Sequence, residues 1–368
     1  GGGGGDFPNR GVSFRFLRKI REDPRIKMPL HTLPYVAKGK IVKPVSDLEA
    51  LNTQELKDLA KAYRVFSDLD GKDEYGRYDG KIAISREELI RGLKRTPTTA
   101  THICECIVKP DTLREKCSYA DMLFNRDEDS GMVARPTVFV SYAWRYSFKD
   151  LVETLTDHFK DLRADEQDKL YFWNDVFVED QNSTFSKPQD YWFDAFKDAV
   201  GSIGHTVLVL SPWKRPIALT RSWCIWEIYS TIATKGILDV AMPPRARAEF
   251  RQALVNEFDS ITKAMCQIDA ETAEAFSAED QKRIKDTIED RVGVTEVNKM
   301  IHARMRKWLA ETGLRALRSE VALHGEKKVA CGTLINNLAL LLKDQGDLTE
   351  AEPLYRRALK GKEEVLGP

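Results

Sequence analysis

The sequence has no surplus of charge of one sign, because Lys plus Arg and Asp plus Glu number 57 each among its 368 residues. No net field therefore favours nucleic acid or anionic lipid, and we expect neither as a partner. No apolar run approaches the roughly 20 residues of a membrane span, so no membrane partner is predicted. The six cysteines lack the spacing of a small disulfide scaffold. This usage is typical of a reducing compartment, and we expect a cytoplasmic protein.

Both ends of the sequence look like cuts. It opens with five glycines and no Met, and it stops at Gly367 and Pro368. We therefore expect a fragment of a longer protein, with room in these residues for two or three domains.

Composition and periodicity divide the chain into five parts. Residues 1–45 mix Gly, Pro and basic residues without a sustained period and predict a flexible tail. Residues 46–100 predict a helix–loop–helix, and 101–134 a polar connector with one helix near 113–124. Residues 135–312 predict an α/β domain with a helical extension, and 313–368 the start of a helical repeat array.

The helix–loop–helix has one helix pattern that begins at Thr53 and a second that opens at Ser85 with Glu88 at capping-box spacing. The loop between them is acidic and Gly-rich. The segment resembles a degenerate EF-hand, because such a loop suits the oxygen ligands of Ca²⁺, but the loop is several residues longer than the usual 12. A calcium site and a solvated acidic hairpin are both open. The candidate calcium ligands are Asp68, Asp70, Asp79 and Glu88.

Alternating strand and helix patterns characterise the central domain. Apolar strands are predicted at 138–140, 170–173, 207–210 and 237–242, with amphipathic helices between the first three. This alternation is typical of βαβ units and a parallel sheet covered on both faces.

Three segments of this domain carry a resemblance, namely Val138–Tyr142 (VFVSY), His205–Ser211 (HTVLVLS) and Ser222–Glu227 (SWCIWE). In order and spacing they resemble the first-strand box, the third strand and the Trp-Cys-x-x-Glu helix of TIR domains. The resemblance covers roughly residues 135–240 and implies a flavodoxin-like parallel sheet. The bulkier second strand and the enlarged loop at 177–189 make the domain a divergent TIR-like one.

The resemblance also implies a candidate catalytic residue. In TIR domains that hydrolyse NAD⁺, a glutamate four residues after the Trp is catalytic, and Glu227 occupies that place after Trp223. One carboxylate could stabilise the cationic ribose left by departing nicotinamide. Tyr142, Trp144 and Trp223 are the candidate residues of an NAD⁺ pocket. The alternative is a helix-capping or ion-paired glutamate, with Arg221 close by, in a domain that only self-associates.

Aromatic residues are frequent in this domain. Trp173, Trp213, Trp226 and the run at 191–193 are candidates for a nucleotide-stacking platform or for the core. We predict the core, because aromatics supply much of the buried area of a sheet–helix interface.

In the last segment Gly346 is predicted to separate two helices, with small residues at 339, 351 and 358 allowing close packing and Leu338, Leu342 and Tyr355 filling the seam. With these positions the segment resembles a tetratricopeptide repeat of the kinesin-light-chain variety. One repeat cannot bury its own face, so we expect the array to continue.

Together these features predict an intracellular signalling scaffold. The TIR-like domain would self-associate, and the repeats would bind protein partners. The alternative is an NAD⁺ glycohydrolase that clustering activates through Glu227. Ca²⁺ is the one candidate cofactor, and NAD⁺ the candidate substrate.

Overall fold

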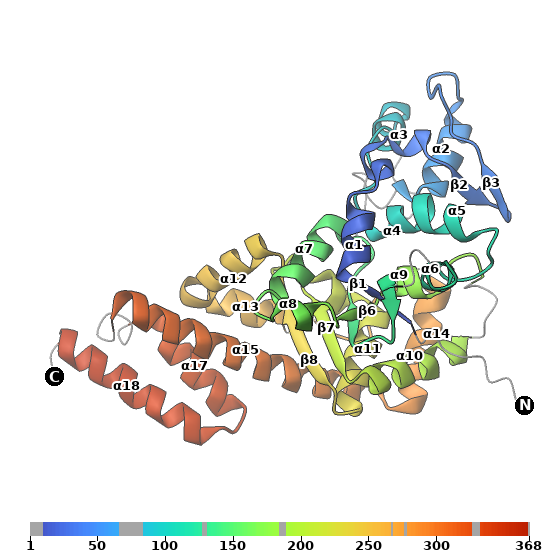
Figure 1. Ribbon diagram of the computed structural model, residues 1–368. Coiled ribbons are helices and arrows are strands. Elements are labelled where there is room, and N and C mark those ends of the chain that lie inside the picture. The colour runs from blue at the N-terminus through green and yellow to red at the C-terminus, as the bar shows by residue number, and fades with distance from the viewer. Residues whose placement is uncertain are drawn as a thin grey trace, which may run out of the picture. The chain divides into compact units, whose positions relative to one another are not determined.

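The computed structural model describes residues 10–65, 84–126, 131–183, 189–265, 268–275, 278–325 and 332–366. The chain forms two compact units, Gly1–His205 and Thr206–Pro368. Its architecture is mixed α/β, with a mostly parallel six-stranded sheet in the order β4-β1-β6-β5-β7-β8 and a helical C-terminal part (Figure 1). Among the described helices, none is long and apolar enough to cross a membrane.

The predicted βαβ unit is present in the first unit of the chain. β5 (Val138–Ser141) and β6 (Tyr171–Trp173) are parallel, with Val138 opposite Phe172, and both strands are almost entirely buried. α7 (Phe148–His158) connects them and buries one stripe, as its three- and four-residue spacing predicts. The remaining elements of this stretch are α8 (Ala164–Gln167), α9 (Asp175–Val178), α10 (Gln189–Ile203) and β7 (His205–Val209).

The structure corrects the prediction of a flexible tail over residues 10–45, the part of that segment that it describes. β1 (Gly11–Ser13) lies between β4 (Val133–Ala134) and β6 and is antiparallel to both. α1 (Phe14–Arg21) follows and buries four apolar side chains. Elements this short show no sustained hydrophobic period in the sequence, and the strands that β1 pairs with are distant in the chain. Beyond them lie η1 (Pro24–Lys27), η2 (Leu30–Thr32), β2 (Tyr35–Ala37) and β3 (Lys40–Val42).

The two helices predicted at the EF-hand-like segment are present. α2 (Thr53–Ala62) and α3 (Arg86–Leu93) pack together, and each begins with a capping box. At α3 this is the Ser85–Glu88 pair that the sequence predicts. Their common core includes Leu56, Leu59, Tyr63, Leu89 and Leu93.

The segment predicted as a polar connector is largely helical and buried. It contains α4 (Ala100–Ile103), a π-helix η4 (Cys104–Val108), α5 (Lys109–Thr112) and α6 (Tyr119–Phe124). Every residue of η4 is buried. Even the Glu105 carboxylate fits there, because Lys109 Nζ approaches it to 2.8 Å and Arg64 Nε to 3.5 Å. Charge pairing explains why a polar sequence is buried.

The second unit contains the fourth predicted strand and the helical extension. Its aromatic core joins Trp213, Phe250 and Trp308, with successive ring centroids 5.5 Å apart. The predicted domain boundary between residues 312 and 313 falls inside one continuous helix, α15. The elements are η7 (Ile217–Thr220), α11 (Ser222–Ala233), β8 (Ile237–Ala241), α12 (Pro244–Asn256), α13 (Phe258–Met265), α14 (Ala278–Arg291), α15 (Val294–His324), α17 (Thr333–Asp344) and α18 (Leu348–Leu366).

Candidate functional site

Two of the predicted NAD⁺-pocket residues meet where β5 and β6 end. Trp144 Nε1 donates to Asp175 Oδ2 at 2.7 Å, and the Tyr142 hydroxyl lies 3.3 Å from Asp175 Oδ1. The same hydroxyl donates to Asn174 Oδ1 at 3.0 Å. Asn174 and Asp175 directly follow β6, and Tyr142 directly follows β5. The carboxyl ends of adjacent parallel strands thus place these side chains at one edge of the sheet.

The Asp175 carboxyl is electrostatically unusual. Burial raises its pKa to about 6, although hydrogen bonds from Trp144, the Val176 N–H and Tyr142 act in the opposite direction. Burial also raises the pKa of Tyr142, and the nearby Asp175 charge adds to this. Tyr142 is therefore a neutral hydrogen-bond donor around pH 7, facing a carboxyl that titrates just below it.

The loop after β5 is also held by backbone contacts from an earlier segment. The Thr101 N–H donates to the Trp144 carbonyl at 3.1 Å, and the Phe148 N–H to the Thr98 carbonyl at 2.8 Å. Thr99 and Ser147 form an isolated antiparallel bridge. The loop from residue 142 to 147 is thus fixed on one side by the Asp175 side chain and on the other by residues 98–101.

The other two candidate residues lie on α11 in the second unit. Trp223 is partly buried, and Glu227, one turn later, is 7% exposed. Spacing i, i+4 places both on one face of the helix. Nearly every residue of α11 is buried, so Glu227 does not lie on an exposed helix. Tyr142 and Trp144 belong to the first unit, so the structure describes the four residues as two separate pairs.

The start of α11 is covered by backbone from a later segment of the same unit. The Ser222 N–H donates to the Glu274 carbonyl at 2.8 Å, and the Glu274 N–H to the Thr220 carbonyl at 2.7 Å. The Ser222 hydroxyl donates to the Ala273 carbonyl at 2.9 Å. The Ser222 N–H is one of the backbone donors at the start of a helix that have no partner within the helix, and the Glu274 carbonyl satisfies it.

Of the four candidate calcium ligands, only Glu88 lies within the described residues; Asp68, Asp70 and Asp79 lie outside them. Its carboxylate accepts the Ser85 N–H at 2.8 Å, and this bond lowers the pKa of Glu88. In this structure Glu88 closes the capping box.

The tryptophans considered for a stacking platform are core residues. Trp173, Trp213 and Trp226 are between 1% and 3% exposed. Trp173 stacks on Phe139 with centroids 4.7 Å apart. The side chains of residues 191 and 192 lie outside the described ones.

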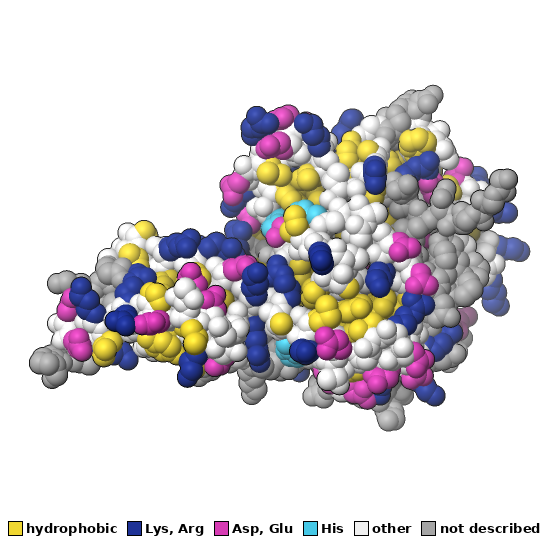
Figure 2. Space-filling model, turned by 90° about the horizontal axis from the view of Figure 1, so that it is seen from below, with side chains coloured by type: hydrophobic (Ala, Val, Ile, Leu, Met, Phe, Trp, Pro, Cys, Tyr) yellow, Lys and Arg dark blue, Asp and Glu magenta, His cyan; other side chains and the backbone are white. Residues whose placement is uncertain are grey.

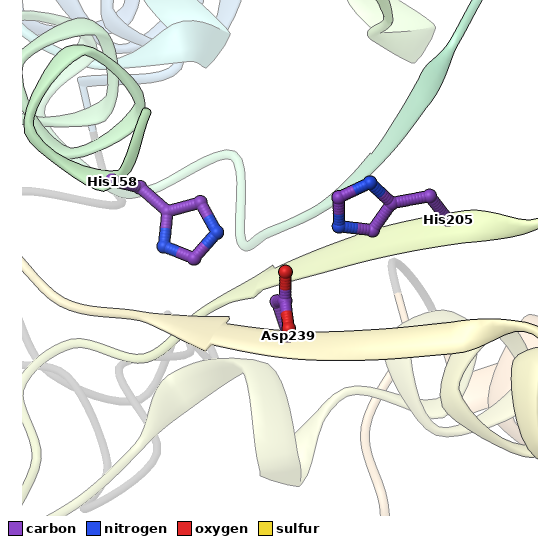
Figure 3. Close-up of side chains that lie close together, drawn as sticks. All are labelled: His158, His205 and Asp239. Carbon is purple, nitrogen blue, oxygen red and sulfur yellow. The ribbon is translucent and has the colours of Figure 1, made fainter. Parts of the chain in front are cut away.

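A group of metal-ligand types is visible in Figure 3. Figure 3 labels His158, His205 and Asp239, and the ligand atoms of the two histidines of the first unit lie within 4.8 Å of each other. His158 ends α7 and His205 begins β7, whereas Asp239 comes from β8 of the second unit. The first unit by itself supplies two imidazoles, fewer than the three protein ligands of a typical catalytic zinc site, and no metal site is proposed.

The C-terminal helices form the predicted hairpin. Ala339, Ala351 and Ala358 are at most 2% exposed where α17 and α18 meet. Gly346 has φ +82°, with its N–H bonded to the Lys343 carbonyl and the Asp347 N–H to the Leu342 carbonyl, both at 2.9 Å. This is the Schellman pattern that ends a helix at glycine. A tetratricopeptide-repeat family model matches residues 332–368. The C-terminal segment is therefore a tetratricopeptide repeat, a unit that supports protein interaction.

One residue of the repeat differs from its predicted position. Tyr355 is 37% exposed, and Leu354 fills the seam instead at 7%. The reason is the spacing of the buried face, since Ala351, Leu354 and Ala358 follow one another at three and four residues. Tyr355 belongs to an exposed apolar stripe of α18, defined by Leu348, Tyr355 and Leu359. Hydrophobic side chains are also visible on the C-terminal helices at the left of Figure 2.

The other comparisons give no relative. No curated protein and no solved structure matches the chain significantly.

Sequence reasoning missed the role of Asn174 and Asp175. The available signal was their position, two polar residues directly after an apolar strand. Residues 98–101 gave no signal, because their function in the fold is carried by backbone bonds.

Proposed function

We propose that this chain is a scaffold in which a divergent TIR-like domain self-associates and kinesin-light-chain-type repeats bind protein partners. The observation that carries the scaffold role is the repeat at 332–368, with its ordered hairpin. The order β6-β5-β7-β8 supports a flavodoxin-like domain, since it corresponds to 2-1-3-4 in chain order.

The exposed stripe of α18 supports the partner-binding half of the proposal. Leu348 is 64% exposed and Leu359 59% exposed. Exposed large apolar side chains in a row mark surfaces that another chain or repeat covers.

Sedimentation velocity of the whole chain over a wide concentration range tests the scaffold. It also distinguishes self-association through the TIR-like domain from self-association through the stripe of α18. The stripe variant carries Leu348→Glu, Tyr355→Glu and Leu359→Glu, and Lys360→Glu is the matched control on the same helix. We expect wild type, control and stripe variant to associate alike. Association lost only in the stripe variant would assign self-association to the repeat and refute the TIR-like surface.

A second candidate function is cleavage of NAD⁺, with Glu227 as the catalytic carboxylate and Ca²⁺ binding as an accessory property. The observation that favours it is that Glu227 is buried one turn after Trp223. A carboxylate shielded from water attracts the positive charge that develops on the ribose more strongly than an exposed one does.

Nicotinamide release at high protein concentration tests the catalytic role. Glu227→Gln should abolish release, whereas Glu249→Gln, at an exposed position of α12, should not change it. Absence of release from the wild type removes the enzyme function, and equal release from the Glu227 variant removes that residue from it.

A further inference from the structure

One carboxylate joins the exits of two strands in the first unit. Asp175 accepts the Trp144 indole N–H through Oδ2, and through Oδ1 it accepts the Val176 N–H at 2.9 Å and lies within reach of the Tyr142 hydroxyl. Trp144 and Tyr142 lie 31 and 33 residues away from Asp175 in the chain. A short, charge-assisted bond to an indole is the strongest of these contacts.

No other described contact replaces this one for Trp144. The indole has a single donor, its Nε1–H, which donates to Asp175. Asn174, which is fully buried, holds only the Tyr142 hydroxyl, and its Nδ2 has no hydrogen-bond partner among the described residues. Loss of the Asp175 charge would therefore weaken the bond that orients the indole, while the backbone bonds from residues 98–101 keep the loop attached.

We propose that Asp175 is a positioning residue, which fixes Tyr142 and Trp144 at the carboxyl edge of β5 and β6 in the orientation that a nucleotide ligand requires. Trp144 is partly exposed. The consequence for turnover rests on the proposed cleavage of NAD⁺; the positioning of Trp144 does not.

The variant Asp175→Asn isolates this role. The indole and the Val176 N–H use different oxygens of Asp175, so an asparagine, with one acceptor oxygen and no charge, can keep only one of these bonds in place. The control is Asp180→Asn, five residues later, where the carboxylate accepts from the Asn182 N–H and the Ser183 hydroxyl.

Two readouts are made on the whole chain. The first is the ¹⁵N-indole NMR signal of Trp144, assigned with Trp144→Phe. The second is KM and kcat for nicotinamide release from NAD⁺. We expect Asp175→Asn to move the Trp144 proton signal upfield and to raise KM about tenfold, with a smaller change in kcat, as loss of one charge-assisted bond predicts. Asp180→Asn should change neither.

An unmoved Trp144 signal in Asp175→Asn overturns the positioning role, whatever the kinetics. A shifted Trp144 signal in Asp175→Asn with the KM and kcat of the wild type would show that the position of Trp144 does not matter for binding or cleaving NAD⁺. If the wild type releases no nicotinamide, the proposed cleavage fails, and the NMR signal alone decides whether Asp175 positions Trp144.

Discussion

A Cβ atom on Gly313 would lie 2.2 Å from Cδ2 of Leu338. Gly313 is on α15 and Leu338 is fully buried on α17, so the two helices meet so closely that a side chain at 313 would displace Leu338. The first helix of the repeat therefore packs directly on the helical extension that precedes it.

Gly313→Ala should destabilise the second unit because Leu338 must leave its position in a filled core. We expect a cost of about 1 kcal/mol, overpacking being partly offset by the better helix propensity of alanine. In a Leu338→Ala background the same change should be stabilising. Urea unfolding of the four proteins gives the coupling energy, and additive effects would show that the two residues do not compete for space.

Gly346→Ala should also destabilise the hairpin, for a different reason. Nothing lies within 4 Å of a Cβ there, so the cost comes only from φ +82° and should be about 1 kcal/mol. Gly131→Ala is the control, at a glycine with equally open space and no left-handed φ. Thermal unfolding with no difference between the two variants would contradict the Schellman termination.

The pH dependence of stability should reveal Asp175. Its pKa rises from 3.8 to about 6 on folding, so the folded state binds this proton more tightly than the unfolded chain. The contribution to stability is complete below about pH 4 and is lost as pH rises through 6. The free energy of unfolding of Asp175→Asn minus that of wild type should thus increase by about 3 kcal/mol between pH 4 and 7.

Its titratable neighbours should not obscure this change. Burial raises the pKa of both Tyr142 and Cys104, so both stay protonated throughout that range. Urea unfolding of both proteins at several pH values checks the prediction. A difference that stays flat across this window would mean that the carboxyl is not desolvated.

Calcium binding by the acidic loop remains a prediction, with Asp68, Asp70, Asp79 and Glu88 as ligands. Titration calorimetry should show heat that Glu88→Gln weakens, since the variant removes a charged oxygen ligand. Glu87→Gln, on an exposed neighbour, is the matched control. No heat from the wild type would leave Glu88 with its capping role alone.

The sequence predicted features that depend on local chemistry. The Ser85–Glu88 capping box, the buried strands β5 and β7, and the glycine between α17 and α18 each follow from residues close together in the chain. Their signals are periodicity, side-chain capping and the left-handed φ of glycine.

The features that sequence reasoning missed depend on distant partners. β1 pairs with β4 and β6, more than 100 residues away, and three residues alone give no period. Glu105 is buried only because Lys109 and Arg64 reach it. Asp175 likewise gains its role from Tyr142 and Trp144. Side-chain networks of this kind are set by the tertiary fold and leave little trace in local pattern.

The scaffold role is tested most directly by sedimentation of the wild-type chain and Glu227→Gln side by side at rising concentration. Assembly through a surface does not need the chemistry of that carboxylate, so both proteins should show the same increase in mass with concentration. A wild-type chain that stays monomeric at every concentration would contradict the scaffold.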